Sequence, residues 1–227
     1  MSIFNQLLKK TTPQQGIVLY YLVAIVIAFL LLNLPFVHKP NVNVNPIDTL
    51  FVAVSGISVT GLSPVNIVDT YSTFGQVIIL IILNIGGIGV MAIGTLLWVV
   101  LGKRIGIRER QLIMLDNNRE TMSGTVKLIL DIVKTIFVIE LVGALLLAFY
   151  FYRDNPDLKN ALMQGLFVSI SATTNGGLDI TGESLIPYAN DYFVQTIVMV
   201  LIILGSIGFP VLLLSLIHIS EPTRQAE

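Results

Sequence analysis

Two short polar stretches hold the residues of this sequence that are best suited to chemistry. The first, SGISVTGLS at positions 55–63, lies between apolar segments and is too rich in glycine and polar residues to continue a helix. The second, SATTNGGLD at positions 171–179, is a related copy 116 positions later. The positions that recur at this offset are Phe51-Val52, Ser55 and Gly61-Leu62, as Phe167-Val168, Ser171 and Gly177-Leu178.

The chemistry that these stretches could perform is the replacement of a cation's water shell by backbone carbonyl oxygens. The potassium-channel loop TVGYG works in this way, and SVTGL at 58–62 is similar to it. Successive carbonyls can point the same way only if some residue takes a positive φ, which glycine does at little cost. We expect Gly61 and Gly177 to do so. The predicted K⁺ ligands are the carbonyls of Val59, Thr60, Gly61, Leu62, Asn175, Gly176, Gly177 and Leu178.

A short helix is expected to lead into each stretch. Asn45-Pro46 with Asp48 forms a helix-start signal, and Asn155-Pro156-Asp157 repeats it. The first helix has about eleven residues, which cross only about half of a bilayer. Its carbonyl end would carry roughly half a negative charge and favour cations. Asp179 is the acidic residue nearest to a loop, and the lack of an acidic ring argues against divalent selectivity.

Composition places these elements in a lipid bilayer. The 227 residues are 54% hydrophobic and 12% charged, whereas soluble domains carry about 25% charged residues. The absence of cysteine excludes disulfides and thiolate sites, and two His residues leave little for metal or acid–base catalysis. A net charge of −1 gives no sign of a nucleic-acid partner. We therefore predict no tightly bound cofactor, and K⁺ only as the transported ion.

The predicted fold is an all-α membrane protein built from tandem membrane–pore loop–membrane units. Apolar runs at 16–37, 74–101, 126–151 and 193–214 are long enough to span a bilayer. Basic residues gather at 103–127, which predicts a multi-pass protein of the cell membrane with its N-terminus in the cytoplasm. The predicted divisions are a cytoplasmic segment 1–15, a first unit 16–102, a basic connection 103–125, a second unit 126–213 and a tail 214–227.

Several separate motifs resemble one family. SVTGL, SATTNGGLD, LNIGGIG and VLGKRIGIRER, in this order of elements, resemble the membrane subunit of the TrkH/KtrB/HKT superfamily of potassium transporters, most closely the KtrB type. The family has four pore units, and its filter glycines correspond to Gly61 and Gly177. It usually has alanine at Gly176 and phenylalanine at Leu178. The resemblance implies a homodimer of full-length subunits, a cytoplasmic nucleotide-binding regulatory subunit, and Na⁺ as a candidate coupling ion.

Two departures from the family bear on function. The sequence contains two of the four units, and residues 214–227 resemble translated sequencing-adapter sequence, so we expect that tail not to be native. The favoured function is potassium uptake through a channel-like pore. A non-transporting half-protein or assembly subunit is the alternative. An intramembrane hydrolase using Ser58 is remote because Thr60 replaces the last glycine of a nucleophile elbow. We therefore predict that the chain is not an enzyme.

Two polar residues inside predicted spans could also have a role. Glu140 lies deep in the third span and Asn84 in the second. A charged side chain at the centre of a membrane helix costs about 2.5–3.5 kcal/mol on insertion scales, so it usually faces protein or water. For Glu140 the alternatives are a hydrogen bond to a neighbouring helix, an anchor for a half-helix, or a direct contact with the ion. Asn84 is more suited to bridging helices.

Overall fold

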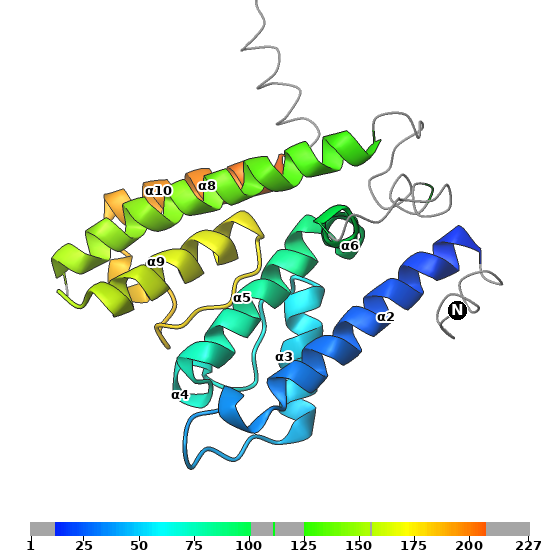
Figure 1. Cartoon of the computed structure of the whole chain (residues 1–227). Coiled ribbons are helices and arrows are strands. Elements are labelled where there is room, and N and C mark those ends of the chain that lie inside the picture. Colours follow the sequence, from blue (N-terminus) through cyan, green and yellow to red (C-terminus); the bar gives the residue numbers. More distant parts are fainter. Residues whose placement is uncertain (1–11, 101–110, 112–124, 155, 208–227) are drawn as a thin grey trace, which may run out of the picture.

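The computed structural model describes residues 12–100, 111, 125–154 and 156–207 (Figure 1). The described residues form helices joined by loops, with no strand beyond one isolated bridge between His38 and Tyr71, so the predicted all-α class is confirmed. Most of the predicted segments 1–15 and 103–125, and all of the tail 214–227, lie outside the described residues.

The first unit begins with the helix α2, Pro13–Leu32, and continues through the short 3₁₀ turn η1, Pro35–Val37. The half-helix α3 follows at Pro46–Ile57, then α4 at Ile67–Thr70. The expected start of α3 is confirmed, since the Asn45 side chain accepts the backbone N–H of Ile47 at 3.2 Å. With 12 residues, α3 is about 18 Å long and is shorter than the hydrocarbon core of about 30 Å.

The second predicted span is not one helix. It is divided into α5, Thr73–Ile88, and α6, Val90–Val100. Gly89 separates them with a φ of 101°, a conformation in which the backbone cannot continue a right-handed helix. The apolar run at 74–101, predicted to be one membrane span, is thus divided between two helices. Hydropathy alone could not reveal the break, because residues on both sides of Gly89 are apolar.

The second unit repeats the order of the first. The long helix α8, Thr125–Asp154, is followed by the half-helix α9, Leu158–Thr173, the 3₁₀ turn η2, Ile186–Tyr188, and α10, Tyr192–Ser206. Two segments, Gln14–Leu32 and Val126–Asp154, are long and apolar enough to cross a bilayer. The predicted span 193–214 is described only as far as residue 207.

Helix α5 is central to the packing. It lies between α3 of its own unit and α9 of the second unit (Figure 1), and one hydrophobic cluster joins all three helices. Ile79 and Leu83 of α5 are buried there, together with Phe167 of α9. A separate hydrophobic cluster packs α8, α9 and α10 against one another. The outward surfaces of α2 and α8 are apolar instead, as with Phe149, which is 76% exposed. This distribution suits helices whose outer faces contact lipid.

Candidate ion-binding loops

The chain leaves both half-helices by the same hydrogen bonds. After α3, the Thr60 N–H donates to the Ser55 carbonyl at 2.9 Å, and after α9 the Gly176 N–H donates to the Ser171 carbonyl at 2.8 Å. Both donors and both acceptors differ by 116 positions, so the repeat found in the sequence is also a repeat in backbone structure.

Hydroxyl groups at the helix ends repeat in the same way. Ser58 Oγ donates to the Val54 carbonyl at 2.7 Å, and Thr174 Oγ1 donates to the Ile170 carbonyl at 2.7 Å. The same two carbonyls also accept the backbone N–H groups of Ser58 at 2.8 Å and Thr174 at 2.9 Å, so each residue bonds twice to the last turn of its helix. The Ser58 hydroxyl also pairs with Thr60 Oγ1 at 2.7 Å rather than with a histidine, so it lacks the arrangement of an activated nucleophile.

The loops need left-handed backbone at four positions. Gly61 has a φ of 78° and Gly177 a φ of 66°, which confirms the positive φ expected at both glycines. Val59 (φ 55°) and Asn175 (φ 57°), also 116 positions apart, share this conformation, and the sequence reading missed them. Asparagine adopts a positive φ more readily than most residues, so the residue type at Asn175 gave a weak indication of it. A β-branched residue such as Val59 gives none.

The two loops touch each other at their glycines. A Cβ atom added to Gly61 would lie 2.6 Å from the Gly176 carbonyl oxygen, and one added to Gly177 would lie 3.3 Å from the Gly61 Cα. The fold thus brings together two segments that are far apart in the sequence. A cavity of about 510 Å³ lies beside the contact, and Gly61, Gly177 and Asp179 help to line it.

Glycines on α5 and α10 let these helices press against the half-helix ends. A Cβ on Gly86 would lie 2.5 Å from the Gly56 carbonyl oxygen, and a Cβ on Gly205 would overlap the Thr173 carbonyl oxygen. Gly87 packs against Thr174 in the same region. Gly86 and Gly87 therefore permit close packing of α5 behind the loops.

Comparison with known proteins identifies the family. The TrkH family, described as cation transport proteins, matches residues 5–225. The chain belongs to the TrkH family. Ktr system potassium uptake protein D of Bacillus subtilis (strain 168) is 50% identical over 209 residues, which are 92% of this chain and 46% of that protein. Ktr system potassium uptake protein B of the same organism is 35% identical over 210 residues, covering 89% and 45%.

The name of a third relative includes sodium as well as potassium. Potassium/sodium uptake protein NtpJ of Enterococcus hirae is 32% identical over 201 residues, which are 88% of this chain and 44% of that protein. The chain spans about half the length of the curated relatives that it matches. These relatives carry the names of ion uptake proteins, and the family is one of membrane transporters rather than enzymes, as predicted.

In this TrkH family member, Asn84 and Glu140 meet across the two units. Both are buried, at 8% and 2% exposure. With its amide oriented to donate, Asn84 Nδ2 lies 2.9 Å from Glu140 Oε1 and 3.3 Å from Oε2. Ser169 of α9 donates its hydroxyl to the Glu140 carbonyl at 2.8 Å. We infer that the pair acts as a brace between α5 and α8, next to the half-helix α9.

The brace can be tested by a double-mutant cycle. We expect Glu140→Leu to lower the unfolding free energy by about 1–3 kcal/mol, because the Asn84 amide loses a buried partner. Asn84→Leu should have a similar cost, whereas the double variant should cost less than the sum of the two single changes. Thermal unfolding of the purified chain in detergent measures these differences. Strictly additive losses would show that the two side chains do not interact.

Metal coordination by side chains finds no support in the described residues. They contain no group of three His, Cys, Asp or Glu side chains that could hold a metal ion. Asp179, the predicted nearest acidic residue, accepts a hydrogen bond from Thr181 Oγ1 at 3.0 Å.

Proposed function

We propose that this chain forms part of a potassium uptake pathway across the cell membrane, in which the loops after α3 and α9 supply the selective surface. The observation that carries the proposal is the meeting of Gly61 with Gly176 and Gly177, in a member of the TrkH family. The ligands would be backbone carbonyls of residues 59–62 and 175–178. Such oxygens are neutral and can replace the hydration shell of a monovalent ion.

The half-helices support this proposal electrostatically. Both α3 and α9 end where their loops begin, so their carbonyl ends lie at the proposed pathway. Each end acts as roughly half a negative charge, which favours a cation over an anion. Uptake could be driven by the membrane potential, since moving one charge across 100 mV is worth about 2.3 kcal/mol.

The assembly is also a proposal. The chain matches about half of the length of its relatives. The pathway would therefore need further pore units, from the same subunit or from another. We propose a homodimer of full-length subunits in the cell membrane, with the N-terminus in the cytoplasm and a cytoplasmic nucleotide-binding regulatory subunit docked on the basic connection 103–125. Na⁺ is the candidate coupling ion, and the name of the Enterococcus relative includes sodium.

A non-transporting half-protein or assembly subunit is the second candidate. Expression in a bacterial strain that lacks potassium uptake separates the two. We expect the complete gene that includes this sequence to restore growth at low potassium and to accelerate K⁺ entry. Membrane-located protein with no K⁺ entry would contradict the proposed function. That outcome would favour the second candidate instead.

A further inference from the structure

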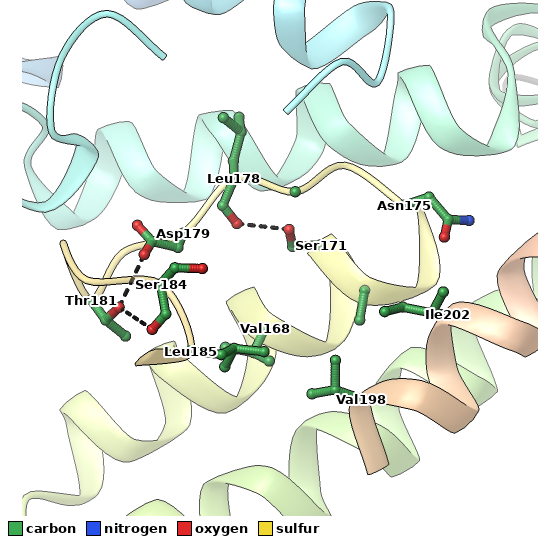
Figure 2. A pocket seen from close by; sticks show the side chains of 12 residues that line it. Val168, Ser171, Asn175, Leu178, Asp179, Thr181, Ser184, Leu185, Val198 and Ile202 are labelled. Atoms are coloured by element: carbon green, nitrogen blue, oxygen red, sulfur yellow. Dashed lines mark hydrogen bonds between the residues drawn. The ribbon is translucent and has the colours of Figure 1, made fainter. Parts of the chain in front are cut away.

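Two serines that correspond in the repeat make opposite hydrogen bonds to their loops. Ser55 Oγ accepts the backbone N–H of Leu62 at 2.9 Å. Ser171 Oγ instead donates to the backbone carbonyl of Leu178 at 2.7 Å (Figure 2). Ser55 and Ser171 are 116 positions apart, and so are Leu62 and Leu178. The corresponding serine therefore bonds to the leucine N–H in the first loop and to the leucine carbonyl in the second.

The bond in the second loop is buried. Ser171 is 6% exposed and Leu178 is 4% exposed, whereas Leu62 in the first loop is 58% exposed. Leu178 belongs to the hydrophobic cluster that joins the two units, so its backbone is held firmly in place. Its carbonyl oxygen points back toward α9 and Ser171 (Figure 2). Among the described residues, no hydrogen bond ends on the Leu62 carbonyl, which stays free for another partner.

We propose that Ser171 is a positioning residue that withdraws the Leu178 carbonyl from the ion pathway, so that the two loops offer unequal sets of oxygens. The first loop presents the carbonyls of residues 59–62 and the second only those of 175–177. This inference rests on the proposed function and narrows its ligand set, because it removes the Leu178 carbonyl, which the sequence predicts to be a K⁺ ligand. The number and field strength of coordinating carbonyls is one proposed origin of selectivity between K⁺ and Na⁺, and on that basis the Ser171 hydroxyl contributes to this discrimination.

The first test removes the hydroxyl from each serine in turn. In the complete transporter, Ser171→Ala frees the Leu178 carbonyl and should change the ratio of K⁺ to Na⁺ uptake rates roughly two- to tenfold, the range that one net hydrogen bond corresponds to. Ser55→Ala is the matched control, because it removes an acceptor from an N–H and frees no carbonyl. Its uptake should fall for both ions with the ratio unchanged. Equal changes of the ratio in the two variants would overturn the inference.

A second pair of variants separates the hydroxyl from side-chain volume. Ser171 lines a cavity of about 230 Å³ (Figure 2), which gives an added methyl group room. Ser171→Thr keeps the donor, and Ser171→Val has the same shape without it, so only the valine variant should change the ratio. A ratio that is the same for threonine and valine would refute the role of Ser171 while leaving the proposed function intact. No uptake of either ion by the unsubstituted transporter would overturn both.

Discussion

Replacing Gly61 with alanine should abolish potassium uptake while leaving some protein in the membrane. Gly61 has a φ of 78°, a conformation that costs other residues about 1–2 kcal/mol. The new Cβ would also lie 2.6 Å from the Gly176 carbonyl oxygen. Backbone cannot yield as a flexible side chain can, so the two loops must move apart. Initial rates of K⁺ entry, normalised to the amount of membrane protein, measure the effect.

Two other glycines calibrate this result. Gly177 has a φ of 66° but more room, since its added Cβ would lie 3.3 Å from the Gly61 Cα. We therefore expect Gly177→Ala to impair uptake less than Gly61→Ala. Gly94 in α6 has nothing within 4 Å of an added Cβ, so Gly94→Ala should be nearly silent. If all three variants lost uptake equally, the contact between the loops would not explain the loss.

The loops show how far a sequence can predict such a site. The positive φ at Gly61 and Gly177 could be predicted because no other residue adopts such a φ at so low a cost. The repeat also showed that these two glycines correspond to each other. Val59 has the same kind of backbone without any compositional sign of it. Its φ follows from the bonds that close the helix end, such as Thr60 N–H to the Ser55 carbonyl. Those bonds are local ones at the helix C-terminus, and they fix a positive φ at position 59 although valine gives no sign of it.

The short helices were predictable for a different reason. Asn45 and Pro46 are local start signals, and α3 begins where they predict. The break at Gly89 was not predictable, because an isolated glycine within an apolar run is as typical of close packing as of a helix end. Asn84 and Glu140 were recognisable as unusual polar residues, but their contact joins helices from different units. A contact between helices of different units depends on how the units pack against each other, and the residue spacing within one unit does not predict that packing.

The packing of the units leads to the second large effect. Gly86 and Gly205 each support the end of a half-helix, because each lies against backbone carbonyl oxygens there. We expect Gly205→Ala to destabilise the second unit strongly, because its Cβ would overlap the Thr173 carbonyl oxygen at the end of α9. Overpacking of this type typically costs about 1–3 kcal/mol or more. Thermal unfolding in detergent should show a lower midpoint, accompanied by lost K⁺ uptake.

Comparing alanine variants of Gly86 and Gly205 tests whether both units need a glycine against the end of their half-helix. Gly86→Ala should act like Gly205→Ala, since its Cβ would meet the Gly56 and Ile57 carbonyl oxygens at 2.5 and 2.6 Å. Gly143→Ala is a graded control, because the three atoms nearest to its added Cβ belong to side chains and not to backbone: Ser169 Oγ at 2.5 Å and the two Leu201 methyl groups at 2.9 Å. A Gly143 variant as damaging as the other two would mean that general crowding decides stability. A mild Gly143 variant beside two severe ones would show that the rigid carbonyl ends of α3 and α9 must be held in place for the loops to meet.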